Sequence, residues 1–307
     1  MEKPQYAFFE GKIVPISEAK IDIRTNSLQY GTAVFEGIRA YWCGDEKKMF
    51  VFRMREHYVR MLDNCKILFI QIPLSIDDLC RITVELLAKE NYTEDAYIRP
   101  FCYFSSTRIS PKLIDMETDI FIYTMPLGDY VDTTRPLKVC VSSWPRVSDG
   151  MTPPRGKISG AYVNTAFQKT EAIRNGFDEA IVLTSDGHVA EGSAMNLFHV
   201  KNGAVSTPPT TDDILEGVTR DAVITLLEKE LHTPVRERKL DRTELYTADE
   251  LFFCGTGAQI AGIASVDHRT IGDGGFGPVT KKLQHIYMRA VRNKLPGCER
   301  WCTEVKT

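Results

Sequence analysis

One lysine in the middle of the chain has neighbours that suit covalent chemistry. Lys157 lies in a loop that Pro153 and Pro154 stiffen and that Gly156 and Gly160 open. The residues after the loop fall at helical spacing, so the loop leads into a helix. A lysine held at such a corner can be shielded from water, and desolvation makes its amine a better nucleophile. Most lysines are exposed, so this loop by itself is more typical of a protein surface.

Glu191 is a candidate acid, because it stands between an apolar strand and a turn at Gly192 and Ser193. A buried carboxylate in this place needs a cationic partner or a strong hydrogen-bond donor. A glutamate at the surface of a turn fits the same residue types, since glutamate is seldom buried unpaired. The role of Glu191 therefore depends on the rest of the chain.

Three further places could bind an anion. The segment Gly217–Thr219 opens a helix, where backbone N–H groups point outward, and Gly255–Ala258 is a turn of small residues after an apolar strand. Helical spacing puts Arg60 near the faces of Glu56 and His57, so its guanidinium can point inward and bind a phosphate or a carboxylate. Each place also has a simpler explanation: a helix cap, a chain reversal and a solvated basic face.

These candidates together match what pyridoxal phosphate needs from a protein. A lysine forms the imine, an acid keeps the pyridine nitrogen protonated, and two anion cradles hold the phosphate and a substrate carboxylate. The sequence has no G-x-G-x-x-G or Walker A pattern that would compete for the phosphate role. Pyridoxal phosphate is therefore the expected cofactor.

The sequence resembles the branched-chain amino-acid aminotransferases, which belong to the class IV (fold type IV) family of pyridoxal-phosphate enzymes. The similarity runs from the first strands to the last helix. Several long motifs in the same order are specific evidence, although any one of them would not be. The marks are Tyr30–Arg39, Ala96–Pro100, Glu191–Gly192 with Asn196–Phe198, Gly217–Asp221 and Gly255–Thr256.

The resemblance implies a role for each candidate residue. Lys157 holds the cofactor and moves the proton, Glu191 pairs with the pyridinium nitrogen, and Tyr162 bonds the ring oxygen. The phosphate is held by Arg60, two backbone amides and Thr256. The implied cofactor-binding residues are Arg60, Lys157, Tyr162, Glu191, Leu215, Gly217, Val218, Thr219, Gly255 and Thr256.

The implied substrate pocket joins apolar side chains to an arginine. Tyr30 and Arg99 bind the side-chain carboxylate of glutamate, and the turn at 256–258 receives the α-carboxylate. Leu127 and Gly257 stand where close relatives often carry tryptophan and alanine, which leaves the pocket's shape open. The implied pocket residues are Tyr30, Phe35, Gly37, Tyr97, Arg99, Leu127, Tyr130, Thr256, Gly257 and Ala258.

The resemblance also implies the reaction. It is transamination between the L-amino acids leucine, isoleucine and valine and 2-oxoglutarate, by a ping-pong route through pyridoxamine phosphate. A D-amino-acid or (R)-amine aminotransferase on the same fold is the main alternative. A lyase acting on aminodeoxychorismate and a binding protein without catalysis are two others.

The elements that must position these residues are predicted from hydrophobic periodicity and turn signals. Strands and helices mix without strict βαβ alternation, so the pattern predicts an α+β or mixed α/β fold. Strands are predicted at 6–9, 13–15, 21–23, 49–52, 96–104, 119–123, 137–143, 179–183, 196–200, 251–254 and 260–266, and helices at 54–68, after Ser75, after the lysine loop, and at 219–230, 242–247 and 279–294.

Turn-forming residues predict a linker at 127–136. This linker divides the chain into a small N-terminal α/β domain at 1–126 and a large C-terminal domain at 137–307 that carries the lysine. The resemblance implies that the cofactor lies between these two domains.

Composition excludes several classes of protein. The net charge of -3 on 307 residues is spread without a basic block, so neither nucleic acid nor a membrane surface is an expected partner. No apolar run approaches the roughly 18 residues that span a bilayer, and the first residues lack an apolar signal segment. A cytoplasmic location follows as the expectation. The resemblance implies a homodimer or a trimer of dimers.

The eight cysteines form no C-x-x-C pair, so no metal site is expected. Buried, reduced thiols are the favoured interpretation. Whether Cys298 and Cys302 pair stays open from the sequence.

Overall fold

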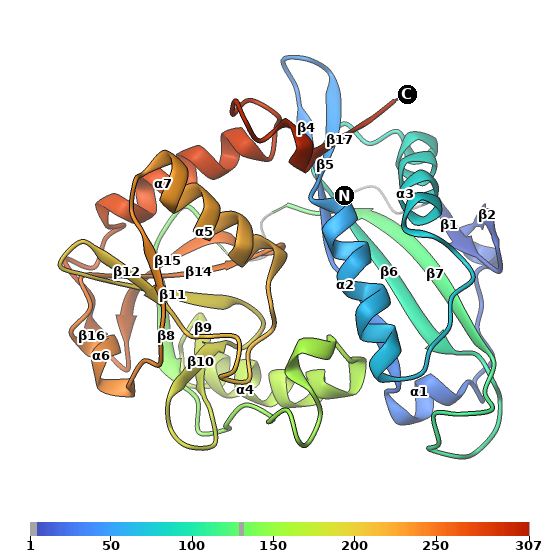
Figure 1. Ribbon diagram of the computed structural model, residues 1–307, viewed down its shortest axis with the longest axis horizontal. Coiled ribbons are helices and arrows are strands. Elements are labelled where there is room, and N and C mark those ends of the chain that lie inside the picture. Colours follow the sequence, from blue (N-terminus) through green and yellow to red (C-terminus); the bar gives the residue numbers. More distant parts are fainter. Residues whose placement is uncertain (1–4, 129–131, 307) are drawn as a thin grey trace. The chain divides into compact units, whose positions relative to one another are not determined.

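The computed structural model describes residues 5–128 and 132–306 (Figure 1). Internal contacts divide the chain into two compact units. The first unit consists of residues 1–128, Gly156–Gly160 and Arg289–Thr307, and the second consists of Asp129–Arg155 and Ala161–Met288. Each unit contains one mixed arrangement of helices and sheet, as the pattern predicted.

The first unit is built on an eight-stranded sheet in the order β17-β5-β4-β6-β7-β1-β2, with β3 paired to β6. Every pairing in it is antiparallel, and the longest joins β6 to β7 residue by residue. The strands are β1 (Tyr6–Phe9), β2 (Lys12–Pro15), β3 (Ala33–Phe35), β4 (Ile38–Cys43), β5 (Lys48–Phe52), β6 (Ala96–Phe104), β7 (Thr118–Pro126) and β17 (Cys302–Val305).

Helices α2 (Met54–Ile67) and α3 (Ile76–Glu90) share one hydrophobic core with this sheet (Figure 1). Ser75 begins α3 through a capping box with Asp78, which satisfies two backbone donors at the helix start. Both helices fall where the periodicity predicted them. Because their apolar residues recur at helical spacing, one face of each is buried and the other meets water.

The predicted strand at 21–23 is wrong. The Asp22 carboxylate accepts hydrogen bonds from the backbone and side chain of Arg24 at 2.7 and 3.0 Å, which closes a turn instead. The short helix α1 (Asn26–Tyr30) follows this turn. Local side-chain bonding of this kind competes with strand pairing.

The second unit is built on a nine-stranded sheet in the order β10-β9-β8-β15-β14-β11-β12-β13, with β16 paired to β15. It mixes parallel pairs such as β8 with β9 and antiparallel pairs such as β11 with β14. The strands are β8 (Leu137–Val141), β9 (Glu179–Leu183), β10 (Val189–Gly192), β11 (Asn196–Lys201), β12 (Ala204–Thr207), β13 (Val235–Glu237), β14 (Glu250–Gly255), β15 (Gln259–Val266) and β16 (Arg269–Thr270).

Four helices accompany this sheet in the described part of the second unit: α4 (Tyr162–Arg174), α5 (Val218–Glu230), α6 (Arg242–Tyr246) and α7 (Pro278–Ala290). The predicted closing helix extends four residues too far, because the chain turns after Ala290 with Asn293 at a φ of 57°. The predicted division at 137 also differs from the compact units in two segments. Ile158 forms a β-bridge with Val34 and β17 pairs with β5, so both segments belong with the first unit.

The described residues bear on two expectations, those about the cysteines and about membrane-spanning segments. All eight cysteines, Cys298 and Cys302 among them, are free thiols. Across residues 5–128 and 132–306, no helix is both long and apolar enough to cross a membrane.

Candidate active site

The loop that carries Lys157 is attached to the first unit by the lysine's own carbonyl and by the residues that follow it. Lys157 has a φ of 40°, a left-handed conformation that is uncommon for a residue with a side chain. Its carbonyl accepts a hydrogen bond from the Phe35 amide at 3.3 Å, and the next residue, Ile158, bridges to Val34. Strained backbone of this kind is retained where surrounding contacts impose it, as at many functional sites.

A pair of glycines makes this attachment possible. The Gly160 amide donates to the Gly31 carbonyl at 2.9 Å, and the Ser159 hydroxyl donates to the same carbonyl at 2.8 Å. A Cβ atom on Gly31 would lie 2.8 Å from the Cα of Gly160, which is too close for any other residue. Gly31 also ends α1 at a φ of 67°. The two glycines therefore fix the lysine loop against the end of α1.

The Phe35 ring lies beside both the Lys157 amine and a second cation, the Arg99 guanidinium. Its Nζ lies 5.1 Å from the centroid of the Phe35 ring, and the Arg99 guanidinium lies 4.6 Å from that same centroid. Arg99 Nη2 donates to the Tyr97 hydroxyl at 2.7 Å. A Cβ atom on Gly37 would lie 2.3 Å from that hydroxyl, so any other residue at this position would displace the Tyr97 side chain. Burial raises the pKa of the Tyr97 phenol, although Arg99 and Lys157 oppose the shift.

Arg99 has a buried donor with no partner. Among the described residues, its Nε is enclosed and makes no hydrogen bond. An unsatisfied buried donor of this kind is costly, so a site that contains one is suited to a ligand with an acceptor.

The first unit also contains a buried carboxylate, that of Glu36, which was not among the residues predicted from the sequence. Glu36 is 0% exposed, and its two oxygens accept from Arg60 Nε and Nη2 at 2.7 and 2.8 Å. His57 Nδ1 lies 2.7 Å from the second of these oxygens. The Arg60 side chain thus points inward from α2, which is one of the two directions that the sequence left open. Glu36 itself lies inside the quoted motif at 30–39.

The pKa values of Glu36 and His57 are both lowered, although for different reasons. Burial opposes the ionisation of Glu36, but Arg60 and His57 outweigh it and hold the pKa of the carboxyl well below its usual range. Burial also lowers the pKa of His57, and Glu36 offsets only part of that shift. Glu36 is therefore ionised and His57 neutral at neutral pH.

In the second unit, Glu191 is buried at the end of β10 with a cationic partner. The Arg146 Nη2 lies 2.7 Å from one carboxylate oxygen of Glu191, and Asn196 Nδ2 donates to the other at 2.9 Å. The Leu215 amide also donates to this carboxylate, at 3.3 Å. The sequence required a partner of this kind but did not identify Arg146, because the two residues are far apart in the chain.

The segment before α5 is tied to the same group. Asn196 Nδ2 donates a second hydrogen bond to the Leu215 carbonyl at 2.9 Å. A Cβ atom on Gly217 would lie 2.1 Å from Asn196 Oδ1, so any other residue at this helix start would displace the Asn196 amide. Gly217 is the N-cap of α5, so the capping position has no side chain that bonds the backbone amides at the start of this helix.

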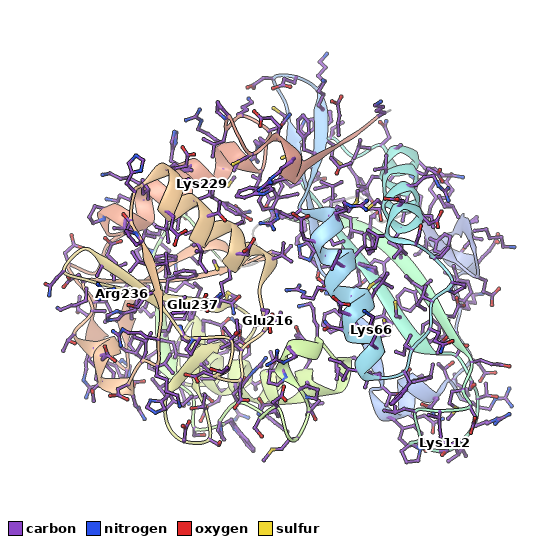
Figure 2. The ribbon with its side chains drawn as sticks, in the orientation of Figure 1. Lys66, Lys112, Glu216, Lys229, Arg236 and Glu237 are labelled. Atoms are coloured by element: carbon purple, nitrogen blue, oxygen red, sulfur yellow. The ribbon has the colours of Figure 1, made fainter. Side chains whose placement is uncertain are left out.

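The rest of α5's first turn is firmly placed. Thr219 is buried, and Arg220 Nη2 donates to the Pro208 carbonyl at 3.0 Å and to Glu237 at 2.8 Å. Figure 2 shows Glu237 on β13 and Glu216 on the segment that leads into α5. The backbone amides at the start of α5 are therefore held in a fixed direction, as an anion site requires.

The remaining predicted residues lie on defined elements. Thr256, Gly257 and Ala258 form the turn between β14 and β15, which closes where Gly255 pairs with Gln259. Tyr162 is the first residue of α4 and is half-buried.

Three substrate candidates need separate mention. The Leu127 amide donates to the Asp95 carbonyl at 2.9 Å. Tyr30, at the end of α1, is 36% exposed and makes no hydrogen bond with Arg99 in the described part of the chain. Tyr130 lies outside the described residues.

The structure thus brings the predicted residues together in two groups. In the first unit, Lys157, Phe35, Gly37, Tyr97 and Arg99 form one group. In the second unit, Asn196 connects Glu191, Leu215 and Gly217. The residues that the sequence reasoning missed as site members are the partners of each group, namely Glu36, His57, Arg146 and Asn196.

The chain is similar to known proteins along most of its length. The family model for amino-transferase class IV matches residues 33–266. A probable branched-chain-amino-acid aminotransferase of Aquifex aeolicus is 51% identical over 300 residues, which cover 98% of this chain and 96% of that protein.

Solved structures are also similar along nearly the whole chain. A branched-chain amino acid aminotransferase from Thermobaculum terrenum in its PLP form has a TM-score of 0.96 at 36% identity, with 100% of each chain covered. The branched-chain aminotransferase of Escherichia coli has a TM-score of 0.93 at 38% identity and covers 99% of this chain and 100% of that chain. A further branched-chain aminotransferase, complexed with N-(5'-phosphopyridoxyl)-L-glutamate, has a TM-score of 0.93 at 35% identity and covers 100% of each chain.

Proposed function

This chain belongs to the class IV aminotransferases, and we propose that it transfers the amino group between branched-chain L-amino acids and 2-oxoglutarate. Its reaction is pyridoxal-phosphate-dependent transamination. The observation that carries the choice of substrate is the group around Lys157, where the Phe35 ring offers an apolar contact and Arg99 a buried donor. The name of the Aquifex aeolicus relative supports the same donors, and the phosphopyridoxyl-glutamate complex of the similar aminotransferase supports glutamate.

The residues of this chain fit pyridoxal phosphate. The Arg60 guanidinium and the helix start at Gly217 suit the phosphate. The buried Glu191 carboxylate, with Arg146 as its cationic partner, suits the ring nitrogen. When bound, the cofactor supplies an electron sink that stabilises negative charge at the substrate's α-carbon. The residues proposed to hold it are Arg60, Lys157, Tyr162, Glu191, Leu215, Gly217, Val218, Thr219, Gly255 and Thr256.

Lys157 is proposed to move a proton to and from the α-carbon of the substrate with its Nζ amine. The left-handed backbone and the Gly31–Gly160 contact support this role, because they fix the backbone from which the amine extends. Glu191 is proposed to accept a hydrogen bond from the ring nitrogen. The Arg146 and Asn196 donors support its ionised form. Tyr162 is proposed to donate to the ring oxygen.

The pocket is proposed to accept both apolar and acidic side chains. Phe35, Gly37, Tyr97, Leu127 and Tyr130 would contact the apolar side chain of leucine, isoleucine or valine. Arg99, with Tyr30, would bind the side-chain carboxylate of glutamate, since a guanidinium binds a carboxylate through two parallel bonds. The turn of Thr256, Gly257 and Ala258 would receive the α-carboxylate common to all these substrates.

Arg99→Ala tests this division. Turnover with glutamate should fall by about a hundredfold or more, because the carboxylate loses a charged partner in an enclosed site. Turnover with leucine should change by less than about fivefold. Steady-state kcat/KM for the two donors, measured side by side, gives the comparison. Equal losses would place Arg99 outside the dicarboxylate site.

Assembly and location are parts of the same proposal. We expect homodimers or trimers of dimers, supported by apolar side chains that are exposed in each unit: Ile23, Leu28 and Ile109 in the first, and Val163, Phe167 and Ile173 in the second. Light scattering gives the oligomer mass. A cytoplasmic location is proposed because all eight thiols are free, which suits a reducing compartment.

An absorbance titration without any keto acid tests the proposed reaction. L-leucine should remove the yellow band of the bound cofactor, whereas D-leucine, D-alanine and (R)-1-phenylethylamine should not. Loss of the band with D-amino acids or the amine would reassign the function to the alternative on the same fold. A protein that shows no band after pyridoxal phosphate is added would contradict the assignment of the cofactor.

A further inference from the structure

We propose that Glu36 and His57 are positioning residues that fix the direction of the Arg60 guanidinium for the phosphate of the cofactor. The inference rests on the proposed role of Arg60 and adds the two residues through which that role is exerted. Both lie behind Arg60 in the first unit, and neither is assigned a contact with substrate or cofactor.

The geometry of the ion pair restrains the arginine strongly. A single carboxylate, that of Glu36, accepts from both Nε and Nη2 of Arg60 at 2.7 and 2.8 Å. Two parallel bonds fix the plane of a guanidinium as well as its position. A lone bond would leave the fork free to rotate about one axis, so the paired bonds define where the rest of the group points.

The carboxylate is restrained in turn. Its second oxygen also lies 2.7 Å from His57 Nδ1 and accepts from the Gly37 amide at 3.3 Å. Because an ionised carboxylate only accepts, the short contact requires the hydrogen of the neutral imidazole to be on Nδ1. His57 and Arg60 stand one turn apart on α2, so a single helix presents both donors to Glu36.

The exposures identify which member of the pair faces a ligand. The Glu36 side chain is fully enclosed, whereas 13% of the Arg60 side chain remains accessible. The neighbouring pair Arg53 and Glu56 has the opposite arrangement, with the carboxylate as the more accessible partner. A buried ion pair is seldom more stabilising than apolar packing of the same volume. Its value here is the orientation of the arginine that remains within reach of a ligand.

Comparing pyridoxal phosphate with pyridoxal isolates the phosphate interaction. The full-length apoprotein is titrated with each compound by absorbance, and the ratio of the two dissociation constants is compared between variants. Glu36→Gln should raise the dissociation constant of pyridoxal phosphate by about tenfold or more, while the dissociation constant of pyridoxal stays within about twofold of the wild-type value. Glu85→Gln is the matched control, because Glu85 also pairs with an arginine of the same unit but at the surface.

A second variant protects the test against loss of folding in the first. His57→Asn removes one restraint on Glu36 and leaves the Arg60 bonds in place. The ratio of the dissociation constant of pyridoxal phosphate to that of pyridoxal should therefore rise by about threefold. Glu36→Gln combined with Arg60→Gln should show no larger loss than Arg60→Gln alone.

The outcomes separate this inference from the proposed function. If the wild-type protein binds pyridoxal phosphate tightly and both variants keep its ratio, the positioning role is wrong and the function stands. Equal losses for pyridoxal phosphate and pyridoxal would show a general distortion and would also overturn the role. A wild-type protein that does not distinguish the two compounds would overturn the assignment of Arg60 together with this inference.

Discussion

Each unit of this protein contains a buried carboxylate paired with an arginine at 2.7 Å, and the two pairs are built differently. Glu36 receives two nitrogens of Arg60, and His57 from the same helix adds a third bond. Glu191 receives one nitrogen of Arg146, a neutral amide and a long backbone contact from three separate elements. The first pair engages the arginine fork at two atoms, whereas the second surrounds the carboxylate.

This difference suits the ligand contacts proposed for the two pairs. A bidentate carboxylate orients a guanidinium, which supports the proposal that Arg60 contacts the ligand in the first unit. Mixed donors around a carboxylate favour its ionised form, which supports the proposal that Glu191 contacts the ligand in the second unit. Under these proposals, arginine and glutamate exchange roles between the units.

Replacement of the second carboxylate should have the largest effect. Glu191→Gln should lower kcat by several orders of magnitude at saturating pyridoxal phosphate, because a neutral amide cannot hold the ring nitrogen protonated. Glu36→Gln should lose most of its defect once the cofactor is saturating. Steady-state kcat for both variants against cofactor concentration makes the comparison. Similar kcat losses at saturation would mean that the two carboxylates do not differ in role.

Arg146→Gln should have the next largest effect. Glu191 would lose this charged partner while Asn196 and the Leu215 amide remain, so kcat should fall by about ten- to a hundredfold with little change in the KM for leucine. The matched control is Arg238→Gln, because Arg238 pairs with Glu244 in the same unit at a more exposed place. A rise in KM with unchanged kcat would show that Arg146 contacts substrate instead of supporting Glu191.

The two pairs also show what could be predicted from the sequence. Spacing within one helix allowed Arg60 to point inward but left a solvated direction open, whereas the same periodicity predicted α2 and α3 themselves. Arg146 was not predicted, because its contact with Glu191 depends on how a loop after β8 meets the end of β10. Local periodicity contains no information about such long-range pairings.

Apolar residues also limited what could be predicted where they do not pack into a core. The segment at 21–23 contains two isoleucines but is closed by the Asp22 turn. The apolar residues Val163, Phe167 and Ile173 correctly predicted α4 as a helix, yet they are exposed and do not define a core-facing side. Periodicity predicted the element, and its environment depended on neighbours that the sequence does not specify.

Gly217→Ala should have a smaller effect that still reaches Glu191. A Cβ atom at this place would collide with Asn196 Oδ1, so the amide must move and its bond to the Glu191 carboxylate is weakened. The expected loss in kcat is about tenfold or less, because Arg146 remains. Gly150→Ala is the control, since nothing lies within 4 Å of a Cβ there. An unaltered kcat would show that Asn196 does not support the carboxylate.

The smallest expected effect is a pH dependence of stability that only the first pair should show. Burial holds the pKa of His57 below its ordinary value of 6.5, and the groups facing it are Glu36, Arg60 and Lys157. The unfolded chain therefore takes up a proton near pH 6.5 that the folded chain refuses. The stability due to neutral His57 is present above that pH and is lost as the pH falls through it, by about 1 kcal/mol per pH unit.

Denaturant unfolding of the apoprotein between pH 7.5 and pH 5.5 measures this slope. His57→Asn should be less stable overall but should lose less of its free energy of unfolding across the range. The control His232→Asn replaces a histidine that follows the end of α5, far along the chain from this pair, and should retain the wild-type slope. If His57→Asn keeps the same slope, the imidazole is not held neutral by its enclosure. Glu36 would then be supported by a charged histidine, and the first pair would hold one more positive charge than the contrast with Glu191 and Arg146 assumes.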